Sequence, residues 1–133
     1  MTYFLDTNII SYLLKGSINV KYKITNLLLN ADKIYIPAIA YYETKRGLLA
    51  TSANKKLSIL QNFVSTFGIV DITTKTLDIA SENWASLKTK GLIIEDSDLL
   101  IGASAIENDA ILITNNANHL SRLKNIKVEV WEY

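Results

Sequence analysis

Short apolar runs separated by long intervals predict five β-strands in this chain. The runs lie at residues 3–5, 33–36, 68–72, 110–114 and 127–131. The last run alternates polar with apolar side chains, which is typical of a strand at the edge of a sheet.

Helical periodicity fills the intervals between the strands. Apolar side chains recur at spacings of three and four over residues 20–31, 57–67 and 77–87. Gly91 follows the last of these stretches and is a C-cap signal. Residues 99–106 are apolar almost all round, which predicts a helix that is central and buried.

The alternation of strands and helices predicts a three-layer α/β/α fold around a central, mainly parallel sheet of four to five strands. With 133 residues, 49% of them apolar, the chain has the size of one domain, which we expect to span residues 1–133. Ligands of such sheets bind outside the carboxyl ends of the strands. Asp6 and Asn116, which follow the first and fourth strands, therefore fall at the edge expected to carry the function.

Composition restricts the chemistry. The chain has no cysteine and one histidine, so thiol catalysis is excluded and a histidine-rich metal site cannot be built. Its net charge of +1, from 14 basic and 13 acidic residues, is not the strongly basic footprint of a nucleic-acid-binding domain. The start of the chain is unlike a signal peptide, and no apolar run approaches the ~18 residues of a membrane span. We therefore expect a cytoplasmic protein without membrane contact.

Carboxylates must then carry any catalysis. Clustered carboxylates repel one another unless a cation lies between them, and Mg²⁺ and Mn²⁺ accept an all-oxygen shell. Asp6 is the first candidate ligand. It precedes Thr7 and Asn8, and any of the three could cap the next helix. Because one cap suffices, the surplus favours Asp6 as a metal ligand, with Thr7 or Asn8 capping the helix and holding Asp6.

Glu43 is the second candidate ligand. As a solvated helical residue it would pair with Arg46, an interaction worth ~0.3 kcal/mol. Gly47, one turn further, costs about 1 kcal/mol of helix stability against alanine, which predicts that something packs closely there. Lys45 and Arg46 are typical of a solvated face, and a phosphate contact is the alternative.

Asp98 is the third candidate ligand, in the first turn of the helix predicted to be buried. Acidic residues there complement the helix dipole, and Asp96 or Ser97 is a good N-cap. We assign Asp98 as the ligand and Asp96 as the cap, or as a fourth acid at the rim. Gly102, one turn after Asp98, is a second small residue along the same stripe.

Asn116 has two interpretations. Asparagine tolerates the left-handed region, so Asn115 and Asn116 fit a plain turn after a strand. An amide can also hydrogen-bond a phosphate oxygen or a water beside a metal. His119 and Arg122 lie close by in the sequence, and an isolated histidine is most often an ordinary surface or cap residue.

Taken together, these blocks resemble a PIN domain, specifically the VapC-type toxins of bacterial and archaeal toxin–antitoxin pairs. The blocks that carry the resemblance, from residue 3 to residue 131, are Asp6-Thr7-Asn8, Glu43 with Gly47, Asp98 to Ala103, Thr114-Asn115-Asn116 and the terminal Trp131.

The resemblance implies a Mg²⁺- or Mn²⁺-dependent endoribonuclease, inhibited by a cognate VapB-type antitoxin and homodimeric. Its ligand acids map onto Asp6, Glu43 and Asp98. Many PIN domains have a fourth acid at Asn116, so the asparagine should weaken metal affinity. The family often has alanine at Gly102, an exchange expected to be neutral. The chain's opening is somewhat similar to toxins that cut initiator tRNA, so tRNA is one candidate among RNA substrates.

Other functions remain open at this point. Aspartyl-phosphate phosphatases need a second aspartate where Asn8 stands, which counts against them. A non-catalytic PIN-like binding module is supported by Asn116, and a PIN nuclease acting on another nucleic acid is a further alternative. The helices expected at residues 20–29 and 57–67 carry more apolar surface than one small sheet can cover. We therefore expect a homodimer, or an antitoxin segment over the same patch.

Overall fold

The computed structural model describes residues 1–133 throughout. Its elements, in chain order, are β1 (Thr2–Leu5), α1 (Thr7–Leu14), α2 (Ile18–Leu29), β2 (Lys33–Pro37), α3 (Ala38–Ala50), α4 (Asn54–Phe67), β3 (Ile69–Val70), α5 (Thr74–Thr89), α6 (Asp96–Glu107), β4 (Ile111–Thr114), α7 (Ala117–Leu120) and β5 (Lys127–Val130).

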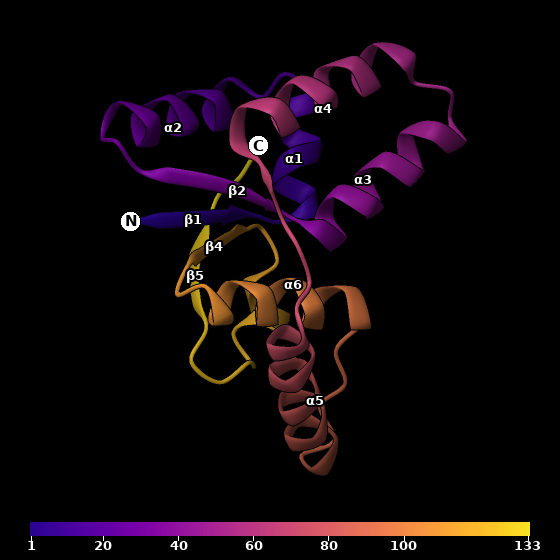
Figure 1. Cartoon of the computed structure of the whole chain (residues 1–133), viewed down its shortest axis with the longest axis vertical. Helices are drawn as coiled ribbons and strands as arrows, with labels where there is room; N and C mark the ends of the chain where they lie inside the picture. Colours follow the sequence, from indigo (N-terminus) through magenta and orange to yellow (C-terminus); the bar gives the residue numbers. More distant parts are fainter.

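The five strands form one sheet in the order β3-β2-β1-β4-β5, and every neighbouring pair is parallel. Helices α1 to α4 lie on one side of the strands, and α5 and α6 lie on the other (Figure 1). The predicted α/β/α fold is therefore confirmed. Strand β5 is an edge strand, as its alternating pattern predicts. The other edge, β3, is only two residues long.

The core lies between the sheet and its helices. The central strands contribute side chains such as Phe4 and Leu112, which are at most 1% exposed. Helix α6 is buried along most of its length, as predicted, and it packs against α5, α3 and the sheet. Gly91 follows α5 with a φ of 70°, which confirms its signal for the end of that helix. The short helix α7 was not predicted. None of the helices combines the length and the apolar character needed to cross a membrane.

The strand order brings three chain segments to the carboxyl edge of the sheet. Strand β1 lies between β2 and β4, with Leu5 opposite Ile113. Asp6 follows β1, α3 follows β2 directly, and Asn115 follows β4. Because the strands are parallel, these exits lie side by side.

Candidate active site

Asp6 lies at the carboxyl end of β1 and is 3% exposed. Its backbone N–H donates to the carbonyl oxygen of Ile113 at 2.9 Å, and its Oδ1 accepts from the N–H of Thr7 at 2.8 Å. Asp6 is itself the N-cap of α1, because its extended backbone turns the carboxylate toward the first turn of the helix. The expectation that Thr7 or Asn8 would take this role is wrong.

Two further donors hold the Asp6 carboxylate. Thr114 Oγ1 donates to Oδ2 at 2.7 Å, and Asn8 Nδ2 donates to the same oxygen at 3.3 Å. Asn8 therefore holds Asp6, as expected. Thr114 is fully buried, and sequence reasoning gave it no role. Its position at the end of an apolar strand was the only feature of the sequence that indicated a role. That it contacts Asp6 follows from the pairing of β1 with β4.

Glu43 lies in the second turn of α3, and its side chain is 20% exposed. Thr7 Oγ1 donates to its Oε1 at 2.8 Å, so the residue that follows Asp6 ties the two acids to the same turn of α1. Arg46 lies 3.9 Å from Oε2, which is a long and solvated pair of the weak kind. Gly47 has no atom within 4 Å of the place of a Cβ, so the expected close packing there is wrong.

Asp98 is the acid whose proton affinity changes most clearly. Burial, followed by the negative charges of Asp6, Glu43 and Glu95, raises its pKa from 3.8 to about 6, and His119 opposes the shift. Burial also raises the pKa of Asp6, against the lowering effect of its hydrogen-bond donors, and Glu43 adds to the rise. The three acids therefore lie close enough to repel one another, which is the electrostatic sign of a shared site.

The three acids have the chemistry to bind a divalent metal ion. All the available ligand atoms are oxygens, the donor set that Mg²⁺ and Mn²⁺ prefer. No group of three or more acidic or histidine side chains stands ready to hold an ion in the present arrangement. Closing a shell therefore requires side-chain rotation. Glu43 and Asp98 are only partly buried and can rotate, whereas Asp6 is fixed by its three donors.

Asp96 and Asp98 have different neighbours: Asp98 is under the charges of Asp6 and Glu43, and Asp96 is not among the acids that act on it. The N-cap of α6 is Glu95, without a side-chain hydrogen bond, so the prediction of Asp96 or Ser97 as the cap is wrong. The Asp96 side chain lines a hollow between α5 and α6. Gly102, one turn after Asp98, packs closely against Leu123, because a Cβ at Gly102 would lie 2.2 Å from Leu123 Cδ1. Alanine at that position requires Leu123 to move, which corrects the expectation of a neutral exchange.

Asn116 stands at the start of α7 without a side-chain cap bond. Its N–H donates to Thr114 Oγ1 at 2.9 Å, and its Nδ2 lies 3.4 Å from His119 Nδ1. No hydrogen bond joins its amide to Asp6 or Asp98. The same Thr114 hydroxyl donates to Asp6, so it links the Asn116 backbone to the Asp6 carboxylate.

The family follows from comparison with known proteins. Residues 3–126 match the family described as PIN domain. The chain belongs to the PIN-domain family.

Relatives match this PIN domain along its whole length. The protein named Ribonuclease VapC2 of Rickettsia felis is 34% identical over 99% of both chains, and Ribonuclease VapC1 of Haemophilus influenzae is 28% identical over 98% of both. A crystal structure of VapBC2 from Rickettsia felis bound to a promoter DNA fragment contains a similar chain. It is 33% identical, covers 99% of this chain and 100% of that one, and superposes with a TM-score of 0.90.

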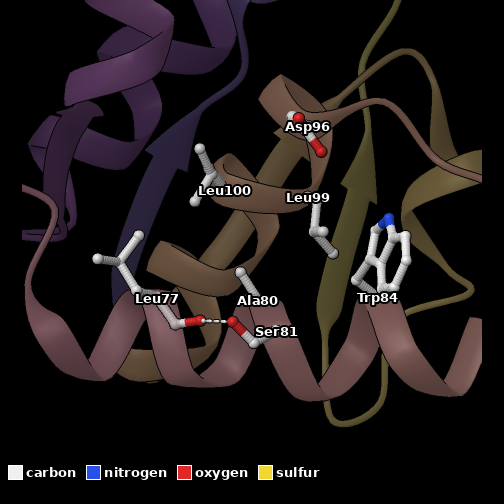
Figure 2. A pocket seen from close by; sticks show the side chains of 7 residues that line it. All are labelled: Leu77, Ala80, Ser81, Trp84, Asp96, Leu99 and Leu100. Carbon is white, nitrogen blue, oxygen red and sulfur yellow. Dashed lines mark hydrogen bonds between the residues drawn. The ribbon is translucent and has the colours of Figure 1, made fainter.

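A hollow of about 480 Å³ lies on the opposite side of this PIN domain from α1 to α4, between α5 and α6. Side chains from the two helices face one another across it (Figure 2), and five of its seven lining residues are apolar. Leu77 and Trp84 beside it are 48% and 46% exposed. The hollow is lined by none of Asp6, Glu43 and Asp98.

Proposed function

We propose that this PIN domain is a metal-dependent endoribonuclease and the toxin of a type II toxin–antitoxin pair. The observation that carries the proposal is a buried, triply hydrogen-bonded Asp6 whose charge acts on Asp98 together with that of Glu43, in a chain with full-length relatives named VapC ribonucleases. Asp6, Glu43 and Asp98 are the proposed ligands of Mg²⁺ or Mn²⁺, and Asn116 borders them.

The chain's own residues prepare the site for a phosphodiester. Three carboxylates repel a phosphate on their own, so the substrate needs a positive charge between itself and the acids. Bound Mg²⁺ or Mn²⁺ supplies that charge, polarises the phosphoryl oxygen and makes water easier to deprotonate. Asp6 is held rigid by Thr7, Asn8 and Thr114, and Thr7 orients Glu43. The hydroxyl and amide donors thus fix two of the three acids in advance.

The proposed inhibitor is a VapB-type antitoxin. The support is that similar solved chains occur in the structures of VapBC2 from Rickettsia felis and VapBC-1 from nontypeable Haemophilus influenzae. Copurification of this chain with the product of a neighbouring short gene, and loss of cleavage in that complex, would bear out the pairing.

We further infer a homodimer formed through α5 and α6. Among the helices, large exposed apolar side chains lie on α2, on α3 and around α5, and none lies on α4. The part of the earlier expectation that rests on residues 57–67 is therefore not supported. Trp84 lines the hollow (Figure 2) and is 46% exposed, so a twofold axis at this surface would pack the Trp84 of each copy against the other copy.

A non-catalytic binding module is the second candidate. It is favoured by Asn116 in the place of a fourth acid and by the absence of a ready-made ligand group. Metal-dependent cleavage decides between the two functions.

The deciding experiment incubates the purified chain with end-labelled single-stranded RNA in Mg²⁺, in Mn²⁺ and in EDTA. We expect cleavage with either metal and none with EDTA. Asp6→Asn protein purified in parallel controls for contaminating ribonuclease. Cleavage that persists in EDTA, or no cleavage with either metal, contradicts the proposal. Mapping RNA ends after induction in cells then identifies the RNA, with tRNA among the candidates.

A further inference from the structure

A polar groove leads away from Glu43 between α1, α3 and α4. It has a volume of about 230 Å³, and only two of its nine lining residues are apolar. Thr7, Ser11 and Lys15 contribute from one face of α1 at intervals of four residues, and Glu43 and Gly47 do so from α3. The groove therefore starts at the acidic site and follows α1 for about 12 Å, at 1.5 Å per residue.

Gly47 keeps this groove open. It is exposed in the interior of α3, has no positive φ, and a Cβ there would meet no atom within 4 Å. Neither backbone conformation nor packing requires glycine at this place, although glycine costs about 1 kcal/mol of helix stability against alanine. The lack of a side chain instead leaves free space one turn beyond Glu43.

Two lysines line the same groove. Lys15 comes from the end of α1 and Lys56 from the start of α4. Neither belongs to any ion pair of the structure, so both ammonium groups are available to an anion. Ser11 adds a hydroxyl, and lysine and serine side chains are typical contacts of nucleic-acid phosphates.

We propose that this groove binds the RNA backbone on one side of the scissile phosphate, with Lys15 and Lys56 contacting phosphates and Gly47 leaving the path clear. The proposal rests on the proposed ribonuclease function and identifies its substrate-binding residues. A phosphate chain fits better than a protein segment, because the groove is lined by two lysine side chains outside any ion pair and by the hydroxyl of Ser11. The net charge of the protein is only +1, so a polyanion needs a local cluster of cations, and the two lysines of the groove provide one.

The first test measures binding of labelled single-stranded RNA in EDTA as a function of salt. For two phosphate contacts on a single strand, the slope of log affinity against log salt should become shallower by about 1.4 in the Lys15→Ala/Lys56→Ala double variant. The loss should be similar for RNAs of different sequence. Lys55→Ala, an exposed neighbour outside the groove, is the charge-matched control for the single Lys56→Ala variant and should change the slope little, whereas Lys56→Ala should make it shallower by about 0.7. Equal effects of Lys55→Ala and Lys56→Ala overturn the proposal.

The second test fills the groove. Gly47→Ala should raise the melting temperature, because it removes a helix-interior glycine, and yet weaken RNA binding. Gly47→Gln should weaken RNA binding more strongly, and in cleavage assays raise KM more than it lowers kcat. Ala50→Gln, exposed on the same helix outside the groove, is the size-matched control. Unchanged RNA affinity in Gly47→Gln contradicts the proposal, and so does a defect confined to antitoxin binding.

The two proposals fail separately. If cleavage requires Asp6 while the lysine and glycine variants bind RNA like their controls, the ribonuclease function stands and the groove proposal falls. If the variants lose RNA binding in EDTA but the unaltered protein never cuts, the groove proposal stands and the catalytic proposal falls.

Discussion

The acidic edge of the sheet and the α5–α6 surface differ in what is unfavourable about each. The acidic edge gathers like charges, and the α5–α6 surface exposes apolar side chains to water. At the acidic edge, burial and mutual repulsion raise the pKa values of Asp6 and Asp98, so ionised acids there oppose folding. At the α5–α6 surface, Trp84 and Leu77 leave apolar area in water beside a hollow. The first region is relieved by cations, the second by another apolar surface.

This difference predicts two separable responses. Metal, pH and salt should act at the acidic edge, because the groups there are charged. Substitution of apolar side chains should act at the α5–α6 surface and leave the metal response unchanged.

Asp6→Asn should abolish most cleavage. Asparagine still caps a helix, so folding should be retained, but the site loses a ligand charge. We expect a loss of at least roughly 100-fold, since even the partners of metal ligands are typically worth 10–100-fold. The measurement is RNA cleavage with Mn²⁺, alongside a thermal melt. Asp71→Asn, an exposed acid after β3, is the control. Cleavage by Asp6→Asn at the unaltered rate would show that the carboxylate mechanism is wrong.

Trp84→Asp should weaken the dimer by roughly 30-fold or more, since truncating an aromatic hot spot typically costs about 2 kcal/mol. Sedimentation of partner-free protein at tens of micromolar measures it. Tyr22→Asp, on the exposed apolar face of α2, is the matched control and should remain dimeric. A monomer produced by Tyr22→Asp alone would move the interface to α2.

Asp98→Asn should stabilise the metal-free protein at neutral pH. The folded-state pKa of Asp98, about 6, lies above its ordinary value of 3.8. Its stabilising contribution is therefore complete below about pH 4 and is lost as pH rises through about 6. The gain at pH 7.5 should be about 1 kcal/mol, because solvent screens this half-exposed group. Melts in EDTA across pH 4–8 measure it, and a gain that does not depend on pH would contradict it.

Asn116→Asp should produce the smallest effect. If Asn116 borders the acids, a fourth carboxylate lowers metal-free stability slightly through repulsion and strengthens Mn²⁺ binding. Added Mn²⁺ should then turn a small loss in melting temperature into a gain. Thermal melts with and without Mn²⁺ compare the two proteins. The same metal-induced shift in both would place Asn116 outside the site.

The sequence predicted most elements, because their signals are local. The periodicity of residues 99–106 anticipated the buried helix α6, and Gly91 marked the end of α5. Local signals failed at helix starts and at the glycines within α3 and α6. Asp6 caps α1 in place of Thr7 or Asn8, because all three residue types can cap a helix and only the backbone angles decide which of them does. Gly47 faces open space, which no pattern within α3 distinguishes from close packing.

By itself, the sequence determined that carboxylates carry any chemistry and that they follow strands of an α/β sheet, since residue types and apolar periods are properties of short segments. Only the tertiary structure decided what surrounds them. Thr114 reaches Asp6 across 108 positions of the chain, and Thr7 reaches Glu43 across 36. Such partners depend on strand order and register, which set distances between segments that no local pattern encodes.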